Sequence, residues 1–228
     1  MDSVKIDPAL RIPAGRHTLG PEEVGRSQRE RLRRAILGCA AERGYAHTTI
    51  ADIVGVAGTS RSAFYEHFES KEACFVEAYE RLTDAFIGAS VEASLGGDGW
   101  EEALDEGMAT YFLWCRDRPE AARAFLVEVH SVGPAGLEAR RQAIERWVAQ
   151  LQTFAGLARR QDPSLPERDE LAYASIIVTA EAYAHDYVRR GRTADLAELI
   201  PGMQQLARDV FRGGGSSRGR SRASGRRR

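Results

Sequence analysis

The sequence has little of what secreted and membrane proteins require. Its 228 residues include only Cys39, Cys74 and Cys115, which lie far apart and form no CxxC pair, so we expect neither a disulfide scaffold nor a zinc ribbon. No apolar run approaches the ~20 residues of a membrane-spanning helix. The first residues lack the basic and apolar regions of a secretory signal. We therefore expect a cytoplasmic protein that does not contact a membrane.

The usual catalytic patterns are also missing. No Ser-His-Asp order, paired-carboxylate motif or glycine-rich phosphate loop stands out. We therefore expect no catalytic residue, no metal site and no cofactor. No alternating strand pattern of any length and no internal repeat is visible, whereas apolar residues recur at helical spacing along most of the chain. The sequence thus predicts an all-α fold.

Charge is unevenly distributed, although the formal net charge is only −1. Residues 1–71 are slightly basic, residues 72–211 are acidic, and residues 212–228 hold seven arginines and no acidic residue. Residues 1–26 contain three prolines, so we expect an irregular arm that includes Lys5, Arg11, Arg16 and Arg26. This arm either enters the minor groove of DNA or is a disordered leader without a function of its own. Residues 213–228 read as a disordered tail that attracts phosphate nonspecifically or only aids solubility.

Two short predicted helices form the clearest local motif. Ser27 and Glu30 have capping-box spacing and predict the start of a preceding amphipathic helix that ends at Gly44. A short helix follows the Thr49–Asp52 capping signal and ends at Ala57. After a turn at Gly58, a second short helix runs from Arg61 to about Phe68, capped by Ser60. This is the plan of a helix-turn-helix, whose second helix enters the DNA major groove.

Side-chain chemistry then predicts which residues contact DNA. Arg61 and Ser62 begin the second helix, where side chains reach base edges, while Tyr65, His67 and Lys71 lie further along and suit phosphate oxygens. Each also has a plainer interpretation: a surface charge for Arg61 and Lys71, a partly buried ring for Tyr65, and a helix-ending group for His67. The predicted DNA-binding residues are Thr48, Thr49, Ser60, Arg61, Ser62, Tyr65, His67 and Lys71.

Residues 36–79 together resemble the DNA-binding domain of the tetracycline-repressor-type (TetR) family. The resemblance rests on Gly44-Tyr45, Thr48-Thr49, Asp52-Ile53, Ala57-Gly58-Thr59-Ser60, Phe64-Tyr65-Glu66-His67-Phe68 and Ser70-Lys71-Glu72. It departs from the family pattern at Thr59, where Val is more usual, and at Glu66, whose charge would repel phosphate. The resemblance implies a homodimeric transcriptional regulator, usually a repressor, with a C-terminal domain that binds a small molecule and dimerises through its last two long helices.

The rest of the chain predicts a helical body for those two tasks. The helix over 171–188 is apolar nearly all round and the helix over 199–211 has an apolar stripe, so the two predict a four-helix dimer interface. Such a dimer would read a near-palindromic double-stranded DNA operator. Large side chains at helical spacing predict a ligand cavity, although the same spacing suits an ordinary core. The predicted ligand-binding residues are Met108, Tyr111, Trp114, Phe125, Glu128, Trp147 and Tyr183.

Polar groups within these apolar stretches leave alternatives open. Glu128 and His130 are candidate polar anchors of the cavity, as are Glu181 and His185, which lie four residues apart on one helix face. Salt bridges or a dimer seam explain them equally well, and metal ligation less well.

The sequence as a whole predicts an arm (1–26), a helix-turn-helix domain (27–72), a ligand-binding and dimerisation domain (73–212) and a tail (213–228). The predicted function is sequence-specific DNA binding that an unidentified small molecule relieves. Two alternatives remain. One is a helical enzyme or small-molecule carrier whose N-terminal helices are scaffold, and the other is a nonspecific architectural DNA binder.

Overall fold

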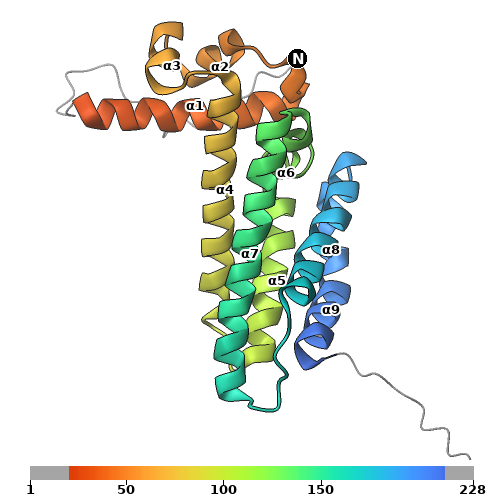
Figure 1. Cartoon of the computed structure of the whole chain (residues 1–228). Coiled ribbons are helices and arrows are strands. Elements are labelled where there is room, and N and C mark those ends of the chain that lie inside the picture. Colours follow the sequence, from red (N-terminus) through yellow and green to blue (C-terminus); the bar gives the residue numbers. More distant parts are fainter. Residues whose placement is uncertain (1–20, 214–228) are drawn as a thin grey trace, which may run out of the picture.

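The computed structural model describes residues 21–213, and every regular element in this part of the chain is a helix, in agreement with the predicted all-α class. Helix α1 lies across one end of a bundle of long helices, with α2 and α3 packed on it (Figure 1). The elements in order are α1 (Pro21–Arg43), η2 (Tyr45–His47), α2 (Ile50–Ala57), α3 (Arg61–His67), α4 (Lys71–Ser94), α5 (Trp100–Asp117), α6 (Pro119–Leu126), η3 (Glu128–Ser131), α7 (Pro134–Gln161), α8 (Glu170–Arg189), η4 (Thr193–Leu199) and α9 (Ile200–Arg212). The predicted arm residues Lys5, Arg11 and Arg16, and the tail after Gly213, lie outside the described residues.

Helix α1 begins earlier than the sequence patterns predict. Its first residue is Pro21, so the predicted start at Ser27 is wrong and Arg26 belongs to a helix rather than to an irregular arm. Proline is well tolerated in a first helical turn because the N–H it lacks has no partner there. Glu22 and Glu23 follow at once, and their negative charges are favourable beside the positive end of the helix dipole.

The helix-turn-helix forms as its capping residues predict. The Thr49 side chain accepts a hydrogen bond from the Asp52 N–H, and the Asp52 carboxylate accepts one from the Thr49 N–H, which completes the capping box of α2. Gly58 then adopts the left-handed conformation, with φ of 62°, and turns the chain toward α3. Ser60 caps α3 by accepting a hydrogen bond from the Ala63 N–H.

An ion-pair cluster joins α1 to α4. The Glu77 carboxylate of α4 accepts hydrogen bonds from Arg29 and Arg33 of α1, and the contacts from Arg29 Nε and Arg33 Nη1 both measure 2.7 Å. The hydrogen bond from Arg29 is the main reason that the pKa of Glu77 lies below its ordinary value. The pairs sit about halfway along α1 and help to fix its crossing over α4.

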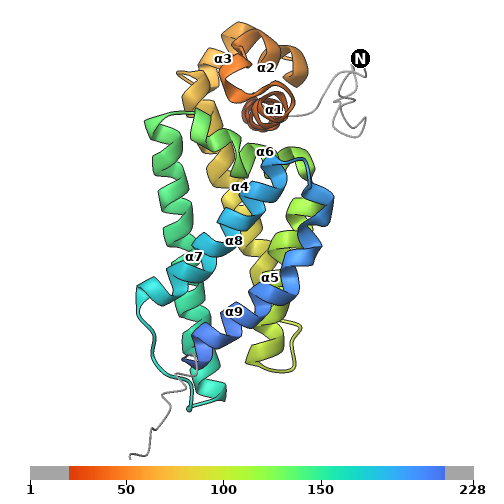
Figure 2. The same ribbon diagram turned by 90° about the vertical axis from the view of Figure 1, so that its right-hand side faces the viewer.

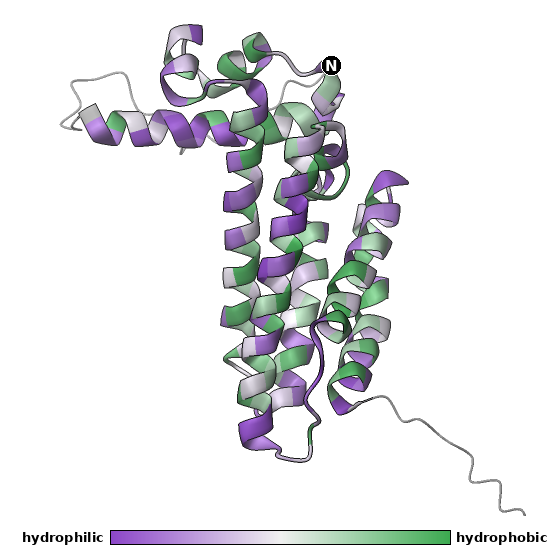
Figure 3. Cartoon of the chain, viewed as in Figure 1, coloured by the Kyte–Doolittle hydropathy of each residue, from purple (hydrophilic) through white to green (hydrophobic). Residues whose placement is uncertain are grey.

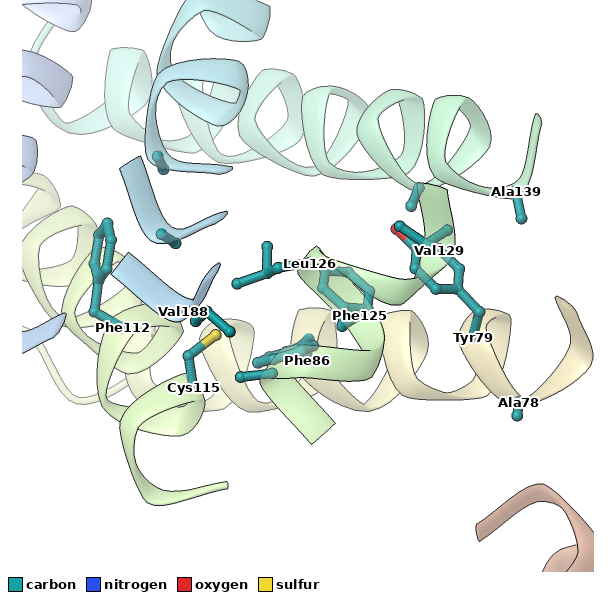
Figure 4. Packing of buried hydrophobic residues seen from close by; sticks show 14 of the residues in the cluster. Ala78, Tyr79, Phe86, Phe112, Cys115, Phe125, Leu126, Val129, Ala139 and Val188 are labelled. Carbon is teal, nitrogen blue, oxygen red and sulfur yellow. The ribbon is translucent and has the colours of Figure 1, made fainter. Parts of the chain in front are cut away.

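The bundle is built from α4, α5 and α7, and α8 and α9 pack along one side of it (Figures 1 and 2). Its upper core is aromatic. Tyr79 of α4 stacks on Phe125 of α6 with ring centroids 4.6 Å apart, and Phe86 packs against Phe125 at 5.1 Å. Figure 4 shows Leu126 beside Phe125, whereas Phe112 lies farther along the bundle, toward Val188. Phe125 thus stands at the junction between α4 and α6.

Helix α8 is not buried all round in the single chain. One of its faces is buried, whereas Leu171, Val178 and Tyr183 are 76%, 44% and 55% exposed. The hydropathy colouring shows many apolar residues along α8 and α9 (Figure 3). The expected dimer surface is therefore uncovered here. Within residues 21–213, no helix is both long enough and apolar enough to cross a membrane.

Candidate functional site

Helix α3 presents a polar face outward. Ala63 and Phe64 are buried against the neighbouring helices, while Arg61, Ser62 and Tyr65 are exposed. Among the described residues Arg61 has no acidic partner, and its guanidinium lies 6.0 Å from the centre of the Tyr65 ring. An unpaired arginine at the start of an exposed helix is free to meet a base edge or a phosphate.

Tyr65 and His67 differ in how far they reach outward. Tyr65 is 49% exposed, and its ring packs edge-on against Phe64, with ring centroids 5.5 Å apart. His67 instead turns toward α1, where its Nε2 lies 3.3 Å from the Gln28 side-chain oxygen. Tyr65 therefore belongs to the outward face, and His67 sits at its edge.

Thr49 and Ser60 are caps that remain at the surface. The Thr49 hydroxyl also donates to Asp52 Oδ2 at 2.6 Å, and these Thr49 contacts lower the pKa of Asp52. The Ser60 hydroxyl lies 2.9 Å from that of Ser62. Both caps are exposed, so their contact with DNA stays a prediction beside an established structural role.

Thr48 and Lys71, both in the predicted DNA-binding set, have hydrogen-bond partners within the N-terminal domain. Thr48 is 2% exposed, and its hydroxyl donates to the Gly44 carbonyl at 2.9 Å. The Lys71 ammonium donates to the carbonyls of Tyr45 and Thr48, both at 2.9 Å, and lies 4.1 Å from the centre of the Tyr45 ring. Burial lowers the pKa of Lys71. Both side chains therefore help to hold the turn before α2, Thr48 through a local hydrogen bond and Lys71 through hydrogen bonds to residues more than 20 positions away.

A cavity of about 460 Å³ runs inside the bundle, between α4, α5, α7 and α8. Four of the predicted ligand-binding residues line it together: Met108, Tyr111, Phe125 and Trp147. Other large apolar residues of the wall include Leu104, Ile144, Leu151, Phe154 and Ile177. The space extends from Tyr79 near the N-terminal helices to Trp100 and Arg160 at the far end of the bundle. Its length and apolar walls suit an elongated apolar molecule.

Three predicted ligand-binding residues do not line this cavity. Trp114 packs on Phe86 from the side, with the Arg118 guanidinium over its ring. Tyr183 faces away from the cavity into solvent. Glu128 is 4% exposed, but its carboxylate is bound by the Tyr45 N–H and by Arg123. Helical spacing alone does not say which of several buried faces borders a void, so the sequence could not separate these three from the four above.

Polar groups gather at the inner end of the cavity. Tyr79, Tyr111 and Glu181 line it there, and burial raises the pKa of all three side chains. Arg140 binds Glu181 with two contacts of 2.6 Å, so this carboxylate is already paired. Neither phenol hydroxyl has a hydrogen-bond partner among the residues that the structure describes. Helical spacing places Tyr79 in a core stripe, and no sequence signal marked it as a cavity residue.

His130 and His185 lie together outside the cavity, with ring centroids 5.6 Å apart. Burial lowers the pKa of each imidazole. Within residues 21–213 no group of three or more His, Cys, Asp or Glu side chains is arranged to hold a metal ion.

Comparison with known proteins points to one family. Residues 32–78 match the family model described as bacterial regulatory proteins, tetR family. A curated relative, the uncharacterized HTH-type transcriptional regulator YerO of Bacillus subtilis (strain 168), is 33% identical over 107 residues. That match covers 44% of this chain, and the chain spans only 36% of the relative's length.

Solved structures of regulators share the whole fold. The fatty acid degradation regulator FadR from Bacillus halodurans has a TM-score of 0.72 and 18% identity, covering 89% of this chain and 99% of that one. FadR from Bacillus subtilis, solved in complex with stearoyl-CoA, has a TM-score of 0.70 and 17% identity, covering 81% and 98%. A TetR-family regulator from Marinobacter aquaeolei VT8 has a TM-score of 0.63 and 20% identity, covering 83% and 97%. At these identities the likeness concerns the fold alone.

Proposed function

We propose that the chain, whose residues 32–78 match the tetR family of bacterial regulatory proteins, is a sequence-specific DNA-binding repressor released by a small molecule. The observation that carries the proposal is the outward face of α3, with Arg61 unpaired among the described residues at its start. Such a helix fits a major groove, and its first side chains reach the base edges.

The exposed apolar residues of α8 support a homodimer. Leu171 and Val178 lie seven residues apart and therefore on one face of the helix, where a second copy would cover them. A two-fold dimer presents two α3 helices about one DNA turn apart, ~34 Å or slightly more, so its operator is near-palindromic. We keep the predicted division near residue 72 in this proposal, although α4 itself runs without a break from the N-terminal helices into the bundle.

The cavity supports an effector with a long apolar body. FadR from Bacillus subtilis, which shares this fold, was solved with stearoyl-CoA, a molecule with such a chain. The hydroxyls of Tyr79 and Tyr111 add one requirement at the inner end, because an effector with a hydrogen-bond acceptor there satisfies donors that have no partner among the described residues. The effector relieves repression by favouring a dimer in which the α3 helices are wrongly placed for DNA.

Two other functions receive less support. The hypothesis of an enzyme or carrier that uses the bundle alone does not explain why the chain also has α3 with an exposed polar face. A nonspecific architectural binder gives no reason for an apolar cavity. Competition by unrelated DNA at physiological salt separates the last case from a specific regulator, because a specific protein keeps its preferred site.

The test is selection of binding sites from random DNA with the full chain, followed by binding measurements on the selected duplex. A near-palindromic consensus is the expected result. Arg61→Ala should weaken binding by about 1–3 kcal/mol and relax the preference at one or two base pairs. The control is Arg141→Ala, which removes an exposed arginine on α7, far from α3. Absence of a consensus, or an Arg61→Ala protein with unchanged affinity and preference, would refute the proposal.

A further inference from the structure

We propose that the Glu128 carboxylate is the link through which occupancy of the cavity is transmitted to the DNA-binding helices. The inference rests on the proposed function and deepens it, because it assigns the coupling to one side chain. Glu128 lies in η3, directly after α6, and none of its atoms lines the cavity. Its role is therefore positioning and not ligand contact.

The first observation is a buried hydrogen bond between distant parts of the chain. The Tyr45 backbone N–H donates to Glu128 Oε2 at 2.9 Å, although the two residues are 83 positions apart. The other carboxylate oxygen pairs with the Arg123 guanidinium at 3.1 Å. A charged acceptor that is paired and hydrogen-bonded makes a stronger hydrogen bond than a neutral one.

The second observation is what this bond holds. Tyr45 begins η2, the turn that connects α1 to the helix-turn-helix. The preceding Gly44 has φ of 85°, and a Cβ there would lie 3.7 Å from Glu128 Oε2, so the carboxylate lies directly against the turn. Lys71 binds the carbonyls of Tyr45 and Thr48. The turn is thus held at its N–H by the bundle and at its carbonyls by the start of α4.

The third observation connects the bond to the cavity. Phe125 lines the cavity and stacks on Tyr79, and it lies three residues before Glu128 on a short, continuous segment. Helix α6 also packs against α1. An effector too large for the space at the inner end of the cavity displaces Phe125, because the ring forms part of the wall there. That displacement moves η3 and with it the acceptor of the Tyr45 N–H.

These contacts give the two states that coupling requires. With the cavity empty, the bond from Tyr45 to Glu128 fixes η2, and through it the placement of α2 and α3. With the cavity filled, the bond lengthens or breaks and the helix-turn-helix is no longer held at one orientation. Only a contact that differs between the two states can transmit a preference, and this bond is such a contact.

The test uses a cavity-filling substitution in place of the unidentified effector. Ala143 of α7 is buried and lines the cavity, so Ala143→Phe places a ring in the space. The matched control is Ala103→Phe, which fills the cavity near Trp100, away from Phe125. Each substitution is made in the wild-type, Glu128→Ala and Glu128→Gln backgrounds. Affinity is measured for the duplex selected from random DNA, as a double-mutant cycle.

The expected results follow from the position of the bond. Ala143→Phe should weaken DNA binding about tenfold in the wild type and less than about twofold in Glu128→Ala, where the link is already absent. Glu128→Gln keeps an oxygen acceptor for the Tyr45 N–H and should restore most of the tenfold response. Ala103→Phe should have a smaller effect than Ala143→Phe in the wild type.

Two outcomes overturn the inference: an Ala143→Phe effect equal in the wild type and Glu128→Ala, or no effect in the wild type. Either leaves the proposed function standing if the wild type selects a DNA sequence, whereas a failure of selection refutes the proposed function itself. If Glu128→Ala does not fold, hydrogen exchange of the Tyr45 amide decides the matter. Exchange should be faster in Ala143→Phe than in the wild type, and unchanged exchange overturns the link.

Discussion

The N-terminal helices, α1 to α3, and the bundle of α4 to α9 bury apolar side chains in opposite ways. The small N-terminal core is filled, with Leu32, Ile36, Ile53 and Phe64 wholly inaccessible to solvent. The bundle keeps a cavity of about 460 Å³ although it has more apolar residues with which to fill it. Unfilled space costs stability, since wall atoms lose dispersion contacts. A well-packed core in α1 to α3 suits a rigid DNA-binding unit, whereas a cavity in the bundle suits a ligand-binding domain that changes conformation.

The largest expected effect concerns the filled core. Phe64→Ala should destabilise the protein by about 3–5 kcal/mol, because it removes a fully buried ring and leaves a cavity in a core that is otherwise filled. Leu151→Ala on the cavity wall should cost less, about 2 kcal/mol, because its side chain already borders a void. Urea denaturation of both variants measures the difference. Equal losses would contradict the contrast between a filled and a hollow region.

The next effect concerns the outer surface of the bundle. Val178→Glu places a charge on the exposed apolar face of α8 and should weaken the dimer by on the order of 3 kcal/mol, since the charge would be buried without a partner. The fold should survive, because Val178 is exposed in the single chain. Light scattering against concentration reports the dimer, and circular dichroism reports the fold. An unchanged dimer would show that this face of α8 is not the interface.

A smaller effect concerns the ion pairs between α1 and α4. Arg29 and Arg33 lower the pKa of Glu77 in the folded state, so its carboxylate adds stability that is fully present above the ordinary pKa of 4.5. That stability is lost as pH falls through the lower pKa of the folded state. Glu77→Gln should therefore cost about 1 kcal/mol at pH 7, after allowance for partial exposure.

The check on Glu77 is its pH dependence. The difference in unfolding free energy between the wild type and Glu77→Gln should shrink as pH falls from 5 toward 3. A difference that stays constant over this range would mean that the ion pairs contribute nothing and that the packing of α1 on α4 alone sets the crossing.

The same division between local and distant contacts explains what the sequence could predict. The caps Thr49 and Ser60 and the turn at Gly58 depend on neighbours within four residues, and all three are confirmed. The contacts of residues whose partners are distant in sequence are harder to predict. Lys71 donates to the Tyr45 carbonyl, 26 positions away, and Glu128 accepts from the Tyr45 N–H, 83 positions away, so the residues around each in sequence do not reveal these contacts.

The residues that line the cavity are likewise only partly predictable from the sequence. Met108, Tyr111, Phe125 and Trp147 line it as predicted, but Trp114 and Tyr183 have the same size and helical spacing and do not. Which buried face borders a void depends on how helices far apart in sequence cross. The start of helix α1 is a prediction that fails although it depends only on local sequence. Ser27 and Glu30 have the spacing of a capping box, but the helix has already begun at Pro21, followed by two acidic residues.

The smallest effect on stability, and the sharpest test of the hollow region, is Tyr79→Phe. The Tyr79 hydroxyl has no hydrogen-bond partner among the described residues, so its removal breaks no bond within the protein. Unfolding free energy should change by less than about 0.5 kcal/mol, whereas loss of a satisfied buried hydrogen bond would cost about 1 kcal/mol.

An effector that presents an acceptor at the inner end should bind about tenfold more weakly, since it loses that bond. Calorimetric titration of an effector found by thermal-shift screening measures the affinity, with Tyr173→Phe, at a buried tyrosine that does not line the cavity, as the matched control. A stability loss of 1 kcal/mol or more, with ligand affinity unchanged, would mean that the hydroxyl serves the protein's own packing and that the inner end of the cavity reads only apolar shape.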